Sequence, residues 1–248
     1  MNSPFFFGVG GVVSADIAAP DHEREQSFYA NVLTTGSAPL WREDLHNRNG
    51  TPIIGLGKRT PEYESLPLQW MPHFQVADVG TSVERAIELG GRELMHGKDS
   101  NGNSQWAGLA DASGAAFGVI PIVDEATAKS YESDQIAYIS WLSLASPDAQ
   151  AACEFYEKVI GWKTVPSGDS GSHEIRRGDG VVAGEIRPAS SRDDIPSVWI
   201  LHVPVNDLSE SLRRVVQNGG KVLEASRDHR KAVLQDPIGV HFGLQSSE

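Results

Sequence analysis

The sequence predicts an α+β fold built from two tandem units, because three segments of its first half return in its second half in the same order. Residues 70–78 return as 199–207, Phe28-Tyr29 as Phe155-Tyr156, and residues 111–118 as 236–243. The copies are shifted by 129, 127 and 125 positions, respectively. A nearly constant shift indicates a duplicated unit whose few insertions fall in loops. Any function assigned to the chain must therefore suit a tandem protein.

Each unit is predicted to open with a strand and a helix. Apolar runs at residues 9–18 and 139–145 predict the strands. Ser146 is a candidate N-cap for the second helix, with Pro147 at its first position. The apolar faces of the two helices comprise Phe28, Tyr29, Val32 and Leu33 in the first unit and Ala152, Phe155, Tyr156, Val159 and Ile160 in the second.

The rest of each unit repeats this order of strand, helix and further strands. Asn49-Gly50 and Asp179-Gly180 are hairpin signals beside short strand candidates. A second amphipathic helix follows in each unit and ends at Gly90-Gly91 or Gly219-Gly220, as expected for a C-cap. The predicted strands after the first helices are residues 51–57, 73–76 and 116–120 in the first unit and 181–187, 202–205 and 241–244 in the second. The chain is thus expected to contain four modules.

Composition supports two globular domains. The 248 residues are 40% hydrophobic, which suffices for two cores. Residues 124–133 are polar and acidic without an apolar period, so we predict a linker there, between units at residues 1–123 and 134–248.

Charge and cysteine content narrow the partners and the compartment. The net charge of −12 argues against nucleic acid and anionic membranes as partners. The single cysteine, Cys153, cannot form an internal disulfide and is expected to be a buried packing residue. The apolar N-terminal stretch lacks the basic residues of a signal peptide. We therefore expect a cytoplasmic protein.

The combination of these motifs resembles the vicinal oxygen chelate superfamily, which includes glyoxalase I, bleomycin-resistance proteins and extradiol dioxygenases. The resemblance is carried by Phe155-Tyr156 with Gly161-Trp162, and by the turn Asp236-Pro237-Ile238-Gly239. The first unit departs from the pattern in having Asp111-Ala112-Ser113-Gly114 at that turn. The resemblance implies tandem glyoxalase-like units, with four βαβββ modules whose curled mixed sheets enclose clefts.

The same resemblance implies a metal site, but the residues at its ligand positions are unsuitable. Metal-dependent members hold one divalent ion with His, Gln or Glu on the first strands and Glu near the end of the last strands. The corresponding positions here are Ser14, Trp141, Met71, Ile200, Gly55, Gly118, Gly184 and Gly243. Glycine and apolar side chains offer no electron-pair donors for a metal. We therefore predict no cofactor, with a divalent metal as the alternative.

A displaced metal site is the alternative that the strands leave open. His73 and His202 each lie two residues beyond an inferred ligand position, and side chains two residues apart on a strand share a face. Asp16 is displaced in the same way on the first strand, and His241 in the opposite direction on the last. Asp16 with His73, or His202 with His241, could hold such an ion. We favour the interpretation in which these side chains form pocket walls and hold no metal.

Several tryptophans are candidates for stacking on a flat ligand. Trp141 occupies a first-strand ligand position and is an even choice between pocket lining and core. Trp70 and Trp199 are expected to fill the core. Trp106 lies in a glycine-rich stretch where we expect a surface loop, with a flap over the cleft as the alternative.

The predicted function is the binding of a small organic molecule, aromatic or partly apolar, by Trp141, His73, His202, His241, Asp16 and Trp106. The alternative is a metal-dependent lyase, isomerase or dioxygenase of the glyoxalase type. A third hypothesis is an interaction module with degenerate clefts. We expect a monomer, because the tandem chain already contains the module pairs that single-unit relatives obtain by dimerising.

Overall fold

The computed structural model describes residues 4–33, 44–46, 52–123, 139–168, 170–190, 195–226 and 228–247. The predicted linker at residues 124–133 lies outside this part of the chain, so the proposed boundaries of the units stay predictions. Among the described residues, no helix is both long and apolar enough to cross a bilayer.

The first unit forms one mixed sheet. Within the described residues its seven strands follow the order β2-β3-β1-β4-β7-β6-β5. Strand β1 pairs antiparallel with β4, and each of the two pairs in parallel with a later strand of its own module, β3 or β7. The strands are β1 (Val12–Ala19), β2 (Asp44–His46), β3 (Pro52–Lys58), β4 (Met71–Val76), β5 (Arg92–Lys98), β6 (Ser104–Ala110) and β7 (Ala116–Pro121). A short 3₁₀ turn covers Pro61–Tyr63.

The second unit repeats this topology. Its eight described strands follow the order β13-β14-β15-β12-β8-β11-β10-β9, with β8 and β12 at the antiparallel centre. The strands are β8 (Trp141–Ser146), β9 (Lys163–Ser167), β10 (Ser172–Arg176), β11 (Val182–Pro188), β12 (Trp199–Val205), β13 (Lys221–Ala225), β14 (Lys231–Gln235) and β15 (His241–Ser246). The predicted tandem α+β fold is confirmed, and each sheet is formed within one unit.

The helices are α1 (His22–Val32), α2 (Val79–Glu88), α4 (Ala149–Val159) and α5 (Leu208–Gln217). Gly90 and Gly219 follow the ends of α2 and α5 with φ of 86° and 88°, as the Gly-Gly pairs predicted. The predicted N-cap of α4 at Ser146 is wrong. Asp148 takes that place, because its carboxylate accepts a hydrogen bond from the Ala151 amide at 2.9 Å, and Pro147 therefore precedes the helix.

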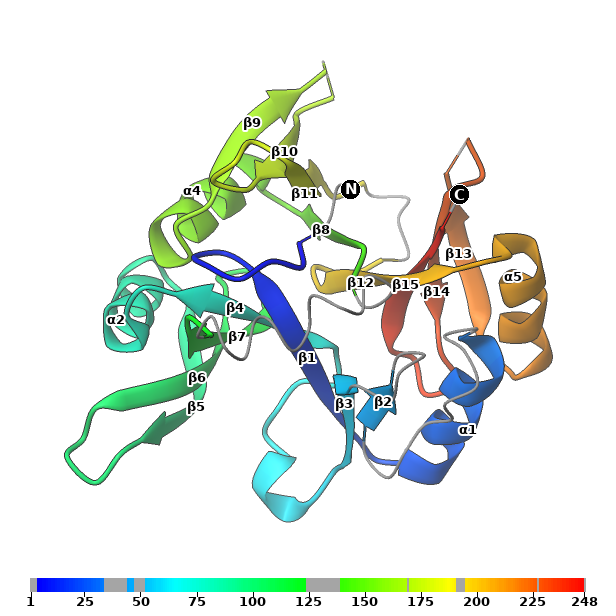
Figure 1. The fold of residues 1–248 in the computed structure, drawn as a ribbon, viewed down its shortest axis with the longest axis horizontal. Helices are drawn as coiled ribbons and strands as arrows, with labels where there is room; N and C mark the ends of the chain where they lie inside the picture. Colours follow the sequence, from blue (N-terminus) through cyan, green and yellow to red (C-terminus); the bar gives the residue numbers. More distant parts are fainter. Residues whose placement is uncertain are drawn as a thin grey trace.

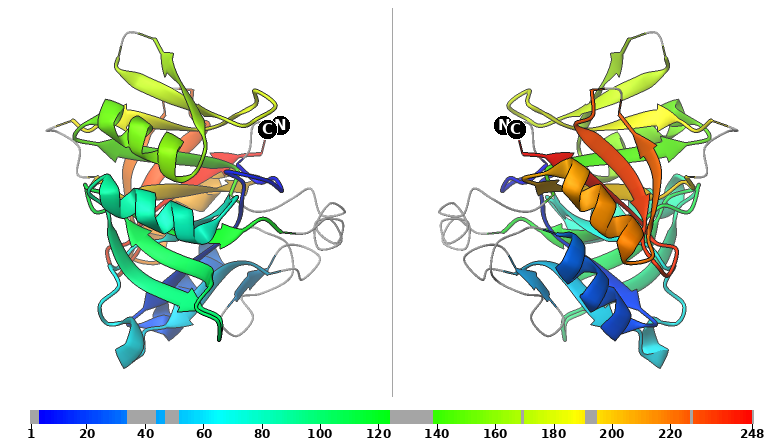
Figure 2. Two further views of the ribbon diagram at one scale, coloured as in Figure 1. Left: turned by 90° about the vertical axis from the view of Figure 1, so that its left-hand side faces the viewer. Right: turned by 90° about the vertical axis from the view of Figure 1, so that its right-hand side faces the viewer.

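The helices of the two units pack across the molecule. Helix α1 lies against α5, and α2 lies against α4, so each pair takes one helix from each unit (Figure 1). Figure 2 shows the two pairs on opposite sides of the molecule. The first helix of each unit therefore contacts its own sheet and also packs onto a helix of the other unit.

Phe28-Tyr29 and its repeat form the centre of this packing. Trp70 donates its indole N–H to Tyr29 at 3.0 Å, and Tyr29 donates its hydroxyl to the Asp236 carboxylate of the other unit at 3.0 Å. The same chain of bonds recurs from Trp199 to Tyr156 to Asp111. The other carboxylate oxygen of each aspartate accepts hydrogen bonds from backbone amides of its own turn. The repeated motifs thus join the two units.

One hydrophobic core extends across both units. It contains Trp70 and Trp199, as predicted, and buried Cys153 as a packing residue. Phe74 of β4 contacts Trp199 of β12 with ring centroids 5.7 Å apart, and both rings are fully buried. Each unit also carries a smaller apolar cluster, and the cluster of the second unit lies next to the candidate site.

Candidate functional site

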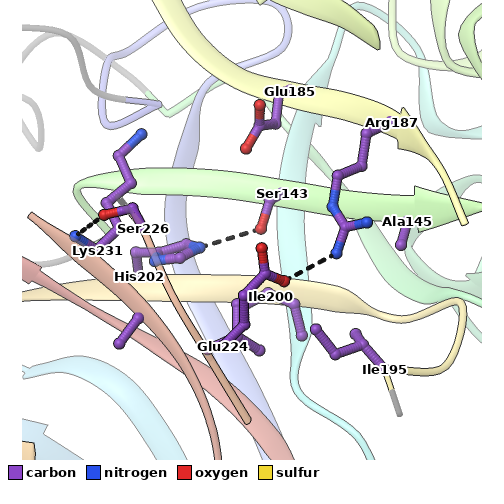
Figure 3. Close-up of a pocket in the computed structure, with 12 residues that line it drawn as sticks. Ser143, Ala145, Glu185, Arg187, Ile195, Ile200, His202, Glu224, Ser226 and Lys231 are labelled. Atoms are coloured by element: carbon purple, nitrogen blue, oxygen red, sulfur yellow. Dashed lines mark hydrogen bonds and ion pairs between the residues drawn. The ribbon is translucent and has the colours of Figure 1, made fainter. Parts of the chain in front are cut away.

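The second unit contains a half-open pocket of about 90 Å³ on the sheet face opposite the core (Figure 3). The strands β8 and β12 form its floor, and β11, β13 and β14 contribute its sides. Its lining combines apolar, hydroxyl and charged side chains: Ser143, Ala145, Glu185, Arg187, Ile195, Ile200, His202, Glu224, Ser226, Lys231, Ala232 and Val233. The volume is below the roughly 300–1,000 Å³ of pockets for drug-sized ligands, so this pocket suits a smaller molecule.

His202 lies at the bottom of this pocket and is 2% exposed. Its ring stands over Gly243, the residue that pairs with it on β15. A Cβ atom at position 243 would lie 2.3 Å from Nδ1 of His202, so the ring fits only because residue 243 is glycine. Nε2 shares a hydrogen bond of 3.0 Å with the Ser143 hydroxyl. Burial, helped by the charge of Lys231, lowers the pKa of His202 to about 3, so the imidazole is neutral at pH 7.

Charged groups approach the pocket from three strands. Lys231 on β14 holds its ammonium 3.4 Å from the centroid of the Trp141 ring, a cation–π contact. Glu185 enters from β11. Arg187 and Glu224 form an ion pair of 3.2 Å that connects β11 to β13 across the pocket. Burial lowers the pKa of Lys231, while Glu185 opposes this shift.

The floor of the pocket is apolar at one end. Ile200 packs with Ile195 and Val198, and Leu223 and Val233 lie against this cluster. Ile200 is one of the positions at which the resemblance implied a metal ligand. Its counterpart in the first unit, Met71, is buried in a similar cluster with Leu66 and Ala116.

The first unit places polar groups differently at the corresponding strands. His73 shares a hydrogen bond of 2.9 Å with Ser14 through Nδ1, and its Nε2 lies 3.3 Å from the Asp16 carboxylate. The ring stands over Gly118, where a Cβ atom would lie 2.5 Å from it. The histidine-over-glycine arrangement is therefore common to both units, whereas Ser14 and Asp16 are replaced by Trp141 and Ser143 in the second.

The structure brings some of the predicted site residues together. Asp16 and His73 are in contact, and Trp141 pairs across the strands with His202. His241 lies two residues before Gly243, the partner of His202, and does not line the pocket. Among the described residues, no three His, Cys, Asp or Glu side chains gather where they could hold a metal ion.

The predicted surface loop at Trp106 is wrong. Trp106 lies on β6, is 43% exposed, and pairs with Gly97 of β5. A Cβ atom at Gly97 would lie 2.2 Å from the indole nitrogen, so the ring rests on the backbone of the neighbouring strand. Gly97 therefore accommodates a large side chain within the β5–β6 hairpin, and Trp106 lies in its second strand.

Sequence reasoning missed Lys231 and Glu185. Lys231 belongs to the charged run 228–231, which resembles solvated surface, and Glu185 lies in a short strand of mixed polarity. The strand period was a usable signal for Glu185, because it places residues 185 and 187 on the same face.

Comparison with known families gives a direct match over most of the chain. The model of the glyoxalase-like domain matches residues 12–120 and again residues 141–245. The chain belongs to the glyoxalase-like domain family. Both glyoxalase-like units are thus recognised separately, in agreement with the repeat and with the two sheets.

Individual proteins resemble this glyoxalase-like chain more distantly. The "Anthracycline biosynthesis protein DauV" of Streptomyces sp. (strain C5) is 27% identical over 190 residues, which cover 74% of this chain and 67% of the relative. A variant of homoprotocatechuate 2,3-dioxygenase from B. fuscum matches with a TM-score of 0.55 at 10% identity, over 96% of this chain and 71% of that one. The 2,3-dioxygenase LapB from Pseudomonas sp. KL28 matches with a TM-score of 0.51 at 13% identity, over 98% and 94%. These structures support the fold alone.

The residues of this chain do not fit the metal ion of metal-dependent superfamily members. Met71 and Ile200 lie within apolar clusters, and neither side chain offers a donor suited to a hard or borderline cation. At Gly118 and Gly243, where the resemblance implied carboxylates, the rings of His73 and His202 fill the space. The glyoxalase-like fold is retained, therefore, with a donor set that differs from the metal-binding one.

Proposed function

We propose that this glyoxalase-like protein binds a small, partly apolar organic molecule in the pocket of its second unit, without a metal ion. The observation that carries the proposal is the position of His202, whose neutral ring fills the space above Gly243 and forms the bottom of the pocket. The pocket also combines an apolar wall with a few convergent polar groups, as small-molecule sites do.

The relatives support a small-molecule role. The name of the Streptomyces relative refers to anthracycline biosynthesis, which involves small organic molecules. The pocket of about 90 Å³ sets a size limit for the ligand, or for the part of a larger ligand that enters it. Molecules of one ring or a short apolar chain are therefore the expected ligands.

A thermal-shift screen tests this proposal. The purified chain is heated with a panel of single-ring phenols, aromatic acids and small aliphatic metabolites, in the presence of EDTA. A ligand that binds the folded state stabilises it by about 2.7 kcal/mol at 100 times its Kd, so the melting temperature rises. We expect such a rise with at least one class of ligand while the chelator is present.

A matched pair of variants locates the site. Val233→Trp places a large ring in the pocket and should abolish the shift, whereas Val222→Trp on the neighbouring strand β13 lies outside the pocket lining and should preserve it. No shift across the panel would favour the role of an interaction module. A shift that appears only with added divalent metal would favour the metal-dependent alternative, for which the Asp16–His73 contact offers two donors.

A further inference from the structure

The pocket of the second unit presents one positive and one negative group, Lys231 and Glu185, that attract each other but form no ion pair within 4.0 Å. Among the described residues, the Glu185 side chain has neither a hydrogen bond nor an ion pair, and no carboxylate oxygen lies within 4.0 Å of the Lys231 ammonium. Figure 3 shows that the two side chains enter the pocket from different strands, β11 and β14. Both charges are therefore available to a molecule that lies between them.

The other ionisable groups of the lining do not compete for this role. Arg187 and Glu224 are paired with each other at 3.2 Å. His202 is neutral, because burial opposes its protonation. The four charged side chains of the lining sum to zero, so the pocket as a whole attracts neither simple anions nor simple cations.

We infer that this pocket takes a small zwitterion of the amino-acid class. Its carboxylate accepts hydrogen bonds from the Lys231 ammonium, its ammonium group donates to the Glu185 carboxylate, and its side chain lies against Ile200 and the neighbouring apolar cluster. This inference rests on the proposed function and specifies the ligand class for the same pocket.

Charge complementarity favours a zwitterion over molecules with a single charge. A simple carboxylate is attracted by Lys231 but repelled by Glu185, and a simple amine meets the reverse situation. The ligand carboxylate also compensates the burial of Lys231, which otherwise lowers the pKa of its ammonium group. Trp141 holds the Lys231 ammonium by its ring face, which leaves the remaining N–H donors free for the ligand.

The test compares three probes that share the isopropyl side chain, by isothermal titration calorimetry on the full chain. L-valine carries both charges, 3-methylbutanoate lacks the ammonium group, and 2-methylpropylamine lacks the carboxylate. Loss of a hydrogen bond to a charged group weakens binding about tenfold or more. We therefore expect valine to bind about tenfold or more tightly than either single-charge probe.

Two variants assign the contacts. Lys231→Met should weaken valine about tenfold or more and strengthen the amine, because it removes the like charge that repels it. Glu185→Gln should weaken valine to a similar extent and strengthen 3-methylbutanoate for the same reason. Lys221→Met and Glu154→Gln, which change exposed residues outside the pocket, serve as matched controls. Circular dichroism confirms that each variant is folded.

The outcomes separate this inference from the proposed function. Equal affinity for all three probes, or equal loss in the control variants, overturns the zwitterion. If a phenol or another neutral molecule raises the melting temperature and valine does not bind, the zwitterion is wrong and the small-molecule site stands. If no molecule binds in either assay, both are wrong.

Discussion

At the scale of single residues, His73 and His202 fill the space above Gly118 and Gly243. Each ring occupies the volume that a side chain at the glycine would need. A carboxylate cannot be restored there while the histidine remains, because interiors are close-packed and do not admit overlapping atoms. The effects of substituting the histidine and the glycine on the free energy of unfolding are therefore expected to be coupled.

Gly243→Ala tests this dependence. The added Cβ would lie 2.3 Å from Nδ1 of a ring that is 2% exposed and has little room to move, so we expect a loss of about 1–3 kcal/mol in the free energy of unfolding. Urea denaturation measures it. Combining the change with His202→Ala should recover part of the loss, and Gly178→Ala, where a Cβ would meet nothing within 4 Å, serves as control. A Gly243→Ala protein as stable as the natural one contradicts the arrangement.

Glu25 is expected to make the stability of the fold depend on pH. It is 1% exposed on α1 beside Asp236, and burial together with that neighbour raises its pKa to about 9. A carboxyl group with a raised pKa stabilises the fold fully below its unfolded pKa near 4.5, and this contribution is lost as the pH rises toward 9. At pH 8 the natural Glu25 therefore lowers the free energy of unfolding relative to a neutral side chain of the same shape.

Glu25→Gln keeps the shape of the side chain without an ionisable group. We expect it to be more stable than the natural protein at pH 8, by about 1 kcal/mol or more, and the difference to shrink toward pH 4. Urea denaturation at pH 4, 6 and 8 measures this trend. Glu154→Gln on the exposed face of α4 should show no comparable dependence. A difference that grows as the pH falls would show that the sign is wrong.

At the scale of elements, the first helix of each unit forms the contacts with the opposite unit that join the two units. Helix α1 carries Phe28 and Tyr29 to the second unit, where Phe28 meets Phe242 with ring centroids 5.8 Å apart. The Tyr29 hydroxyl accepts from Trp70 and donates to Asp236, so two buried groups depend on one oxygen atom.

Tyr29→Phe removes that oxygen and leaves the Trp70 indole and one oxygen of Asp236 without this partner. Unsatisfied buried groups cost about 1–3 kcal/mol each in general, and we expect a destabilisation in that range. Thermal or urea unfolding measures it. Ser27→Ala, on the exposed side of the same helix, should change stability by less than about 0.5 kcal/mol. Equal effects from both substitutions would show that the hydrogen bonds of the Tyr29 hydroxyl contribute no stability.

The elements were predictable to a large extent because their signals are local. The Gly-Gly ends of α2 and α5 require a positive φ that glycine adopts freely, and the apolar stripes of α1 and α4 have helical spacing. The observed start of α4 differs from the predicted one. Ser146 and Asp148 both have side chains that can cap a helix, and only the fold decides between them.

At the scale of the whole molecule, the sequence predicted the duplication but not its purpose. Trp70, Tyr29 and Asp236 are separated by up to 207 positions, and no local pattern reveals that they meet. The pocket was hidden for the same reason. Its charges come from strands β11, β13 and β14, and Lys231 belongs to a run that resembles solvated surface until the fold brings its ammonium over the Trp141 ring of β8.

The central claim for the molecule is that organic ligands replace a metal ion in these sheets. Elemental analysis of protein purified without chelator or added metal tests it most directly, when it is combined with the binding assay in EDTA. The account predicts divalent metal far below one ion per chain and unchanged ligand binding. One tightly held ion per chain, lost in His73→Ala or His202→Ala together with ligand binding, would contradict it.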